Sequence, residues 1–531
     1  MTLPVLVAAM LHPETYPRRP AAVELVQTHI SFVFLAGSEV YKIKKPVRFS
    51  FLDFSTLALR RQMCHEEVRL NRRLAAEIYL GVVAICPTTQ GYRLGPEDDP
   101  AALEYAVHMR RLPSERMLDS LLDRGAVSPD MIDQIARRLA SFHRHADAGP
   151  EVTANGDPAA VWGILQDNFS AARPFRDNTI AAADDDAIQS FAHDFLGRNE
   201  VLFRRRQEQG RIRECHGDLH ADNICLAPEP VIFDCIEFSP RFRYCDTASE
   251  IAFLAMELDF FGRPELAARL VSEYAAAAGD PELPRLVPFY QCYRAYVRGK
   301  VESLKSAEEE VEPKERERAR SKARQHFTLA YRYTWSYARA LVVVAGLSGT
   351  GKSAIAAALQ RRTGFVHINS DVVRKRLAGL APGQRASAAY GAELYSAQHS
   401  ERTYAALLAE GREHLAAGRG VVLDATFQRR AGRAAARGLA AAQGAPFLLV
   451  ECTCPEDEVR RRLAERQRRG ADPSDADWSV YREQSRRFEP ILPEEASCHL
   501  PLCTAGPLAN VAAAIEQALS ARLERAPALK L

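Results

Sequence analysis

Two separate segments of this chain hold the residue types that phosphoryl transfer from a nucleotide requires. Residues 216–223 read His-Gly-Asp-Leu-His-Ala-Asp-Asn, and Asp234 follows at the end of an apolar run. Residues 346–353 read Gly-Leu-Ser-Gly-Thr-Gly-Lys-Ser, between an apolar run and an Ala-rich stretch. Each segment is the core of a complete phosphate-handling site. The question is therefore why one chain should contain two.

The first segment has the H-x-D-x-x-x-x-N spacing of a kinase-type catalytic loop, with His216, Asp218 and Asn223 in the three positions. In that chemistry the aspartate accepts or orients the acceptor hydroxyl, and the asparagine amide oxygen holds a metal ion. Asp234 is expected to bind the Mg²⁺ that bridges the nucleotide phosphates, because carboxylate and amide oxygens suit this ion. These residues predict a catalytic site with bound Mg²⁺.

Upstream residues supply a candidate partner for the nucleotide phosphates. Lys42 and Lys44 lie near the end of the second of two strand-like runs, and either lysine could pair the phosphates. Glu67 lies in the helix predicted to follow and is a candidate to orient the lysine through an ion pair. The catalytic loop alone is only moderately specific, and these residues strengthen the prediction.

The second segment is a full P-loop, G-x-x-x-x-G-K-S. Its glycines let successive backbone N–H groups turn onto phosphate oxygens, its lysine reaches the β- and γ-phosphates, and its serine hydroxyl binds Mg²⁺. Residues 341–345 before it and 354–359 after it supply the strand and helix that such a loop needs. The predicted nucleotide-binding residues are Gly346, Gly349, Gly351, Lys352 and Ser353.

Residues downstream of the P-loop point to a kinase rather than to a switch or a motor. Asp371 ends a second strand-like run, and Arg374 follows one helical turn later on the same face. The carboxylate can take a proton from an acceptor hydroxyl, while the guanidinium can hold an anionic group of the substrate. Asp424 ends a further strand-like run and is an expected metal ligand. Further expected substrate contacts are Thr426, Arg430 and Arg433.

Two more arginines have the spacing of a lid. Arg462 and Arg466 lie four residues apart on a charged helix, ahead of the loop 470–477. A mobile lid at this position would bring guanidinium groups onto the transferring phosphoryl group. The alternative interpretation of residues 460–469 is a solvated basic helix face or a loose RNA-binding patch.

Bulk composition fits a multidomain protein of the cytoplasm. A length of 531 residues is too great for one core, and 47% hydrophobic with 26% charged residues is ordinary for a globular protein. The N-terminus lacks the basic region of a signal peptide, and no apolar run is long enough to span a bilayer. Eleven cysteines without metal-ligand spacing fit reduced thiols in the cytoplasm.

Charge differs between the two parts of the chain. From residue 336 onward there are 27 Lys and Arg against 20 Asp and Glu, whereas the preceding residues hold 43 against 48. A basic C-terminal part suits anionic ligands such as nucleotides and would also suit nucleic acid. Nucleic acid has little support, because no extended stripe of aromatic and basic residues accompanies the P-loop.

Periodicity predicts two different folds in succession. Residues 25–36 and 38–44 read as strands, a helix follows to about residue 74, and strand-like segments return near 81–86 and 104–111. Later residues are mainly helical, up to about 335. Beyond residue 340 apolar runs alternate with helices, which indicates a parallel α/β sheet.

The fold class is therefore α+β followed by α/β, in a multidomain chain. The predicted domains are an N-terminal segment (1–24), a first domain (25–335) with a small lobe (25–110) and a helical lobe (111–335), and a P-loop domain (336–531).

Over roughly residues 20–335 the motifs resemble the aminoglycoside phosphotransferase family, small-molecule relatives of the protein kinases. The resemblance implies a two-lobed kinase-like fold in which Asp218 is the catalytic base and Asn223 and Asp234 are the metal ligands. It favours Lys42 as the ATP lysine, with Lys44 as the competitor. The chain has no Gly-rich loop, and the family instead covers the phosphates with a short polar loop, here ending at Ser31.

Over about residues 340–500 the layout resembles the polynucleotide-kinase and zeta-toxin-like branch of P-loop kinases. This resemblance implies that Asp371 is the general base, Arg374 a substrate binder, and Arg462 and Arg466 the lid arginines. The order of the two domains also resembles a bacterial family of fused proteins, which carries no settled substrate.

These observations predict a bifunctional phosphotransferase that uses ATP and Mg²⁺. Each half would move a γ-phosphoryl group to a hydroxyl of a small molecule or a nucleotide-like acceptor. One alternative makes the P-loop half an ATP-binding regulatory or nucleic-acid-binding module, and another makes the protein a protein kinase or a self-phosphorylating regulator. Oligomeric state cannot be read from the sequence.

Overall fold

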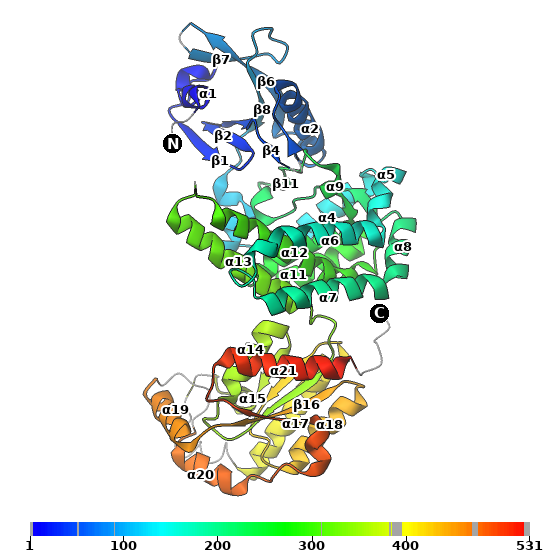
Figure 1. The fold of residues 1–531 in the computed structure, drawn as a ribbon, viewed down its shortest axis with the longest axis vertical. Coiled ribbons are helices and arrows are strands. Elements are labelled where there is room, and N and C mark those ends of the chain that lie inside the picture. The colour runs from blue at the N-terminus through cyan, green and yellow to red at the C-terminus, as the bar shows by residue number, and fades with distance from the viewer. Residues whose placement is uncertain are drawn as a thin grey trace. The chain divides into compact units, whose positions relative to one another are not determined.

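The computed structural model describes residues 4–49, 52–89, 91–309, 311–381, 384, 396–469 and 476–524. The chain divides into two compact units, Met1–Ala330 and Tyr331–Leu531 (Figure 1). The first unit contains an antiparallel sheet with a large helical lobe, and the second is built on a parallel sheet. The predicted fold class is therefore confirmed.

A six-stranded antiparallel sheet forms the small lobe of the first unit, with strand order β1-β2-β3-β8-β6-β7. Residues 25–36, predicted as one strand, form two strands around a tight turn, because the Thr28 hydroxyl accepts a hydrogen bond from the Ser31 N–H at 3.0 Å. The strands are β1 (Val23–Gln27), β2 (Ser31–Ala36), β3 (Glu39–Lys44), β6 (Tyr79–Thr88), β7 (Gly91–Gly95) and β8 (Glu104–Arg110), with a short hairpin of β4 (Arg48–Phe49) and β5 (Leu52–Asp53).

Each face of this sheet is covered by a different part of the chain. Strand β3 alternates, so that Val40 contributes to the core cluster that includes Val68 of helix α2 (Leu57–Ala75). Tyr41 faces the other way and packs with Met10, which follows helix α1 (Val5–Ala9). The N-terminal segment thus belongs to the core of the small lobe, while Lys42 shares the face of α2.

The remainder of the first unit is mainly helical. Helix α10 is almost wholly buried at the centre of this lobe and packs against α11 and α12. Its helices are α3 (Leu118–Asp123), α4 (Pro129–His145), α5 (Pro150–Thr153), α6 (Pro158–Ala172), α7 (Ala182–Arg198), α8 (Glu200–Glu208), α9 (Pro240–Arg243), α10 (Thr247–Phe260), α11 (Pro264–Ala278), α12 (Leu283–Ala307) and α13 (Pro313–Tyr333). Short strands β9 (Ile212–Glu214) and β12 (Tyr244–Asp246) pair with each other, as do β10 (Ile224–Leu226) and β11 (Pro230–Ile232).

The second unit has a five-stranded parallel sheet in the order β14-β15-β13-β16-β17. Such an order places the carboxyl end of β13, where the P-loop begins, beside the ends of β15 and β16. The strands are β13 (Leu341–Ala345), β14 (Val366–Asn369), β15 (Val421–Asp424), β16 (Phe447–Thr453) and β17 (His499–Cys503).

Helices pack on both sides of the parallel sheet, which is why its strands are continuous apolar runs. Helices α14 and α21 contact each other, and α17 contacts both α15 and α18 (Figure 1). One buried cluster between the sheet and helices α15, α17 and α18 contains Val343, Leu407, Leu423 and Leu439. The helices are α14 (Lys352–Thr363), α15 (Ser370–Leu377), α17 (Ala397–Ala416), α18 (Arg430–Ala442), α19 (Glu456–Arg469), α20 (Trp478–Arg487) and α21 (Leu508–Leu523).

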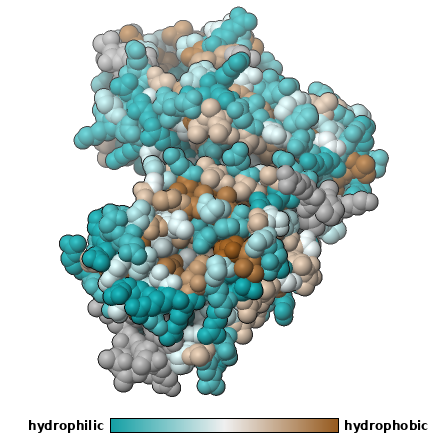
Figure 2. All heavy atoms as spheres, turned by 60° about the horizontal axis from the view of Figure 1, so that its bottom comes forward, coloured by the Kyte–Doolittle hydropathy of each residue, from teal (hydrophilic) through white to brown (hydrophobic). Residues whose placement is uncertain are grey.

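Across the described residues, no helix combines the length and apolarity that crossing a membrane requires. On the face drawn in Figure 2 hydrophilic residues predominate, and hydrophobic residues occur in small groups among them. The exposed large hydrophobic side chains of the second unit are correspondingly few, and include Leu377, Val480 and Leu508.

Candidate active sites

The predicted catalytic loop connects β9 to β10 in the first unit. His220 Nε2 lies 3.2 Å from Asp218 Oδ2, and the Asn223 amide Nδ2 donates to the Asp218 carbonyl oxygen at 3.0 Å. Burial alone would raise the pKa of the Asp218 carboxyl, but the charges of His220 and Arg298 hold that pKa well below its usual range. Asp218 is therefore held ionised, as an acceptor of a proton or hydrogen bond must be.

The hairpin of β10 and β11 brings the two expected metal ligands to one place. Ile224 pairs with Ile232 across the hairpin, so Asn223 and Asp234 lie just beyond the paired ends of the two strands. Asp234 has a left-handed backbone with φ of 61°, which is uncommon for a residue with a side chain and is typical of functional sites. Its backbone N–H donates to the Tyr79 hydroxyl at 3.2 Å, and its carboxylate is 44% exposed.

Both candidate lysines belong to one buried ion-pair network. Lys42 Nζ lies 2.5 Å from Asp234 Oδ1 and 3.0 Å from Glu67 Oε1. Lys44 Nζ lies 2.7 Å from the other oxygen of Glu67 and contacts Glu237. Only Lys42 reaches the partly exposed Asp234, whereas the Lys44 side chain is completely enclosed. The geometry gives Lys42 access to a ligand and Lys44 an internal role.

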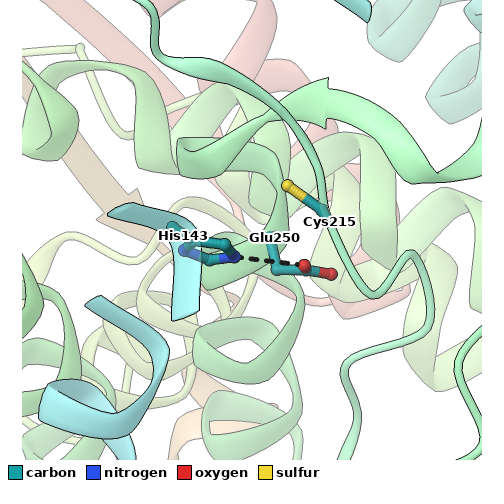
Figure 3. Close-up of side chains that lie close together, drawn as sticks. All are labelled: His143, Cys215 and Glu250. Carbon is teal, nitrogen blue, oxygen red and sulfur yellow. Dashed lines mark hydrogen bonds and ion pairs between the residues drawn. The ribbon is translucent and has the colours of Figure 1, made fainter. Parts of the chain in front are cut away.

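A second buried network fixes the backbone of the catalytic loop. The Glu250 carboxylate on α10 accepts the backbone N–H groups of His216 at 2.5 Å and Gly217 at 2.8 Å. His143 on α4 lies with Nε2 3.3 Å from Glu250 (Figure 3), and its Nδ1 lies 2.7 Å from the hydroxyl of Tyr274 on α11. These bonds join the loop to three helices of the lobe core.

Cys215 lies beside this network, and its sulfur, a His143 nitrogen and a Glu250 oxygen all lie within 4.8 Å of one another (Figure 3). Three such groups could in principle hold a metal ion. Both carboxylate oxygens of Glu250 already accept backbone N–H groups, and burial keeps the pKa of the Cys215 thiol well above its ordinary value. The cluster is therefore accounted for as an anchor of the loop.

Ser31 is not brought to an open site. It is the first residue of β2, opposite Lys44 in the sheet, and its side chain is fully buried with no hydrogen-bond partner for Oγ among the described residues. The predicted phosphate contact from this hydroxyl has no support in the geometry. The reason is the split of residues 25–36 into two strands, which turns Ser31 into the sheet.

In the second unit the P-loop glycines have the backbone that the motif requires. Gly346, Gly349 and Gly351 have φ of 139°, 82° and 89°, a region that disfavours side chains. A Cβ at Gly346 would lie 2.5 Å from the Cys452 carbonyl oxygen. Lys352 begins α14, and its Nζ donates to the Leu347 carbonyl at 2.8 Å, folded over the loop that would hold the phosphates.

Asp424 lies at the centre of a polar cluster beside the P-loop. Its carboxylate accepts from Asn369 Nδ2 at 2.6 Å and lies 3.1 Å from His367 Nε2. Asn369 Nδ2 also lies 3.4 Å from the Ser353 hydroxyl. Burial would raise the pKa of Asp424, but the bond to His367 and the charge of Lys352 hold that pKa below its usual value. The two expected metal ligands of this unit, Ser353 and Asp424, are thus brought together.

The expected acceptor side of the P-loop unit contains an ion pair and a strained turn. Asp371 and Arg374 pair with each other within the short helix α15. Thr426 Oγ1 lies 3.2 Å from the Tyr404 hydroxyl of α17, which also accepts the Phe427 N–H at 2.9 Å. Phe427, which follows Asp424 by three residues, has a left-handed backbone with φ of 45°. In the first unit Asp234 itself has a left-handed backbone.

Two of the arginines expected to bind substrate have different surroundings. Arg433 is only 1% exposed, and its guanidinium donates to Glu495 and to the carbonyls of Phe427, Gln428, Glu489 and Pro490. It holds α18 to the following segments and is not available to a substrate. Arg430 is exposed at the start of α18.

The two expected lid arginines also have different contacts. Arg462 Nη2 donates to the Thr504 carbonyl at 2.8 Å, and a Cβ at Gly351 would lie 3.0 Å from Arg462 Nη1, so this guanidinium rests against the P-loop. Arg466 donates to the Ala476 carbonyl at 2.5 Å, and its positive charge adds to burial in lowering the pKa of Lys352. Most of the expected lid loop, residues 470–475, lies outside the described residues.

Several residues of these sites were not predicted from the sequence: Glu237, Glu250 and His143 in the first unit, and His367, Asn369 and Tyr404 in the second. Glu237 follows Asp234 by three residues, and Asn369 precedes Asp371 by two, so proximity to a predicted residue was a usable signal. Glu250, His143 and Tyr404 come from distant helices, and only the fold brings them near.

Comparison with known proteins divides the chain in the same way. The phosphotransferase enzyme family matches residues 37–289, and the AAA domain family matches residues 341–491. The uncharacterized proteins Rv2004c of Mycobacterium tuberculosis and Mb2027c of Mycobacterium bovis are each 32% identical to this chain over 447 residues, which cover 84% of this chain and 86% of the relative.

Solved structures match about a third of this chain at low identity. A gluconokinase from Sinorhizobium meliloti is 20% identical, covering 36% of this chain and 96% of its own, with a TM-score of 0.27. The APS kinase CysC of Mycobacterium tuberculosis, in complex with AMPPNP and APS, is 23% identical, covering 34% of this chain and 99% of its own, with a TM-score of 0.25.

Proposed function

We propose that this chain, which belongs to the family of the mycobacterial proteins Rv2004c and Mb2027c, is a bifunctional phosphotransferase that uses ATP in both units. A phosphotransferase-family domain is followed by a P-loop domain, and each contains a nucleotide-type site. The observation that supports the proposal is that a carboxylate of each unit interacts with a lysine suited to phosphate: Lys42 Nζ lies 2.5 Å from Asp234 Oδ1, and the charge of Lys352 acts on Asp424.

In the first unit Lys42 would exchange its ion pair with Asp234 for the phosphates of ATP, while Glu67 keeps the ammonium in place. Asp218 would orient the acceptor hydroxyl and take its proton as the oxygen attacks the γ-phosphorus. Glu250 would hold the loop backbone so that this carboxylate stays aligned. Positioning and charge neutralisation, rather than a covalent intermediate, would supply the rate enhancement.

In the second unit the P-loop N–H groups and Lys352 would hold the phosphates. Asp371 would serve as the base for the acceptor, with Arg374 holding both this carboxylate and an anionic group of the substrate. Arg466 would approach the transferring phosphoryl group, whereas Arg462 is placed against Gly351 by its bonds to Thr504. Arg433 has no part in this proposal.

Mg²⁺ fits both donor sets. Asn223 uses its amide nitrogen on Asp218, which leaves its oxygen for a cation beside the exposed carboxylate of Asp234. Ser353 and Asp424 provide a hydroxyl and a carboxylate in the second unit. When bound, the ion would supply positive charge that neutralises the negative charge developing on the phosphates.

The acceptors would be small molecules in the first unit and small or nucleotide-like molecules in the second. For the second unit we favour a kinase of the polynucleotide-kinase and zeta-toxin-like type, because Asp371 and Arg374 follow β14 as that type implies. The cysteines are all free, which supports a cytoplasmic location with reduced thiols.

The test is transfer of label from γ-labelled ATP to a pool of metabolites and oligonucleotides. Asp218→Asn and Asp371→Asn should each remove one labelled product, by about 10²–10⁴ in rate, and leave the other. Label on no acceptor while ATP still binds would favour a regulatory or nucleic-acid-binding P-loop unit. Label on the protein itself would favour a self-phosphorylating regulator.

A further inference from the structure

Helix α20 brings a glutamine side chain onto the backbone of the P-loop. In the second unit α20 lies beside α19 (Figure 1), and from it Gln484 Oε1 accepts the Ser348 N–H at 2.8 Å. Ser348 is buried, and a buried backbone N–H needs a partner. The loop thus depends for this bond on a side chain 136 residues away in the sequence, which the catalytic roles above do not use.

The peptide group between Leu347 and Ser348 is held from both sides. Its carbonyl oxygen accepts from the Lys352 ammonium and from the Thr350 hydroxyl, each at 2.8 Å. Its N–H is bound by Gln484. Because the C=O and the N–H of a planar trans peptide point in opposite directions, a bond that fixes the N–H also fixes the carbonyl. Gln484 therefore sets the direction of the oxygen on which the Lys352 ammonium rests.

Contacts at both ends of α20 hold Gln484 in place. Trp478, Tyr481 and Gln484 follow one another at three-residue intervals, so each lies next to the one before it on the helix surface. Trp478 and Tyr481 pack in an apolar cluster with Leu347 of the P-loop. Just beyond the other end of the helix, the Glu489 N–H donates to a carbonyl oxygen of the turn after β15 at 3.0 Å. A side chain on an element fixed in this way can hold a neighbouring site in one geometry.

We propose that Gln484 is a positioning residue of the second unit. By accepting the Ser348 N–H it keeps the Leu347 carbonyl turned toward Lys352, and so keeps the ammonium over the loop where the phosphates would bind. Its amide nitrogen has no part in this role, and another acceptor oxygen at the same position would serve. The role rests on the proposed function of that unit, because Lys352 is the lysine expected to meet the nucleotide.

Nucleotide titration of the full chain carrying Lys42→Met tests this role, because that change removes the nucleotide site of the first unit. Binding of AMPPNP with Mg²⁺ then reports on the P-loop. Gln484→Met, which keeps the length of the side chain but loses the amide oxygen, should weaken AMPPNP binding about two- to tenfold, the worth of one hydrogen bond. Gln484→Glu keeps an acceptor oxygen and should restore the affinity of the parent chain. A side chain that only filled space would be replaced equally well by both.

Glu483→Met is the matched control, because it introduces the same side chain at an exposed position of α20. Glu483 forms a surface ion pair with Arg487, so its replacement should leave AMPPNP affinity as it is. Hydrogen exchange at the Ser348 amide, measured without nucleotide, should become faster in Gln484→Met and not in Gln484→Glu. Thermal unfolding should show the second unit still folded in each variant.

An unaltered AMPPNP affinity in Gln484→Met would overturn the positioning role. So would a weakening by Gln484→Glu or by Glu483→Met that equals or exceeds the weakening by Gln484→Met. Unfolding of the second unit in Gln484→Met would make the side chain a structural one and would also overturn the role. Absence of AMPPNP binding to the Lys42→Met parent chain would instead contradict the proposed function of the second unit.

Discussion

The two proposed nucleotide sites of this chain are built from different parts of the protein. In the first unit the site is assembled from side chains far apart in sequence: Lys42, Glu67 and Asp234 meet in one buried ion-pair network. In the second unit the proposed site is largely backbone, because Gly346, Gly349 and Gly351 have the positive φ with which a P-loop turns its N–H groups toward a phosphate. The first design depends on the whole fold, and the second on a single loop between a strand and a helix.

This difference teaches where each site is vulnerable. A site made of buried charges fails when one partner is removed, since the others are left uncompensated. A site made of backbone N–H groups tolerates side-chain changes nearby but not changes at its glycines or its lysine. The comparison predicts that loss of a lysine lowers stability in the first unit, whereas in the second unit it lowers nucleotide binding and the rate and leaves stability nearly unchanged.

The largest effect is expected at Lys44, which is enclosed with Glu67 and Glu237. Lys44→Met removes the lysine that contacts the buried Glu237 and leaves Glu67 with Lys42, and removing one partner of a buried pair costs about 3–5 kcal/mol. Calorimetric unfolding should show the first unit melting at a lower temperature and the second unit unchanged.

Lys42→Met should cost less stability, because its partner Asp234 is partly exposed, but should abolish ATP binding in that unit. Equal destabilisation by the two changes would break the proposed division of roles.

Next in size is Lys352, the side chain on which the second site depends. Lys352→Ala removes the one ammonium over the P-loop, and the rate of phosphoryl transfer by this unit should fall about 10²–10³-fold, as for loss of an oxyanion donor. The melting temperature should hardly change, since burial already lowers the pKa of this lysine and disfavours its charge. A large drop in stability would mean that this site, too, is a buried charge network.

The smallest effect is expected at Tyr404. Tyr404→Phe removes the hydroxyl that accepts the Phe427 N–H and contacts Thr426, and so frees a turn held in a left-handed conformation. One such bond is worth about 0.5–1.5 kcal/mol, so transfer should slow several-fold with KM for ATP unchanged. The control is Tyr481→Phe, a buried tyrosine of α20 that packs against α19, and this change should leave the rate as it is. If both variants slowed transfer equally, the Tyr404 hydroxyl would have no specific role in the site.

The same contrast explains how much could be predicted from the sequence. The P-loop, its flanking strand and the parallel sheet are local patterns. Ser353 was predicted from the P-loop motif, and Asp424 because it ends a strand. In the first unit the loop around Asp218 was visible, but Ser31 was expected in a loop over the phosphates and instead begins β2 opposite Lys44, with its hydroxyl fully buried.

Other residues could not be found from local patterns. Glu250 and His143 carry no motif, and they matter because two distant helices bring them to the loop backbone. Arg433 was assigned a role that its surroundings do not support. It was expected to bind substrate, but its buried guanidinium donates hydrogen bonds to Glu495 and to the Glu489 carbonyl. Sequence spacing indicates which residues are near a site, whereas burial decides which of them can meet a ligand.

Counting bound nucleotides tests the central claim most directly, because it needs no knowledge of either acceptor. Isothermal titration of the full chain with the ATP analogue AMPPNP and Mg²⁺ should give two sites per chain, and Lys42→Met and Lys352→Ala should each remove one of them. A single site in the unaltered chain, or the loss of both sites through either change, would contradict two independent phosphotransferase sites.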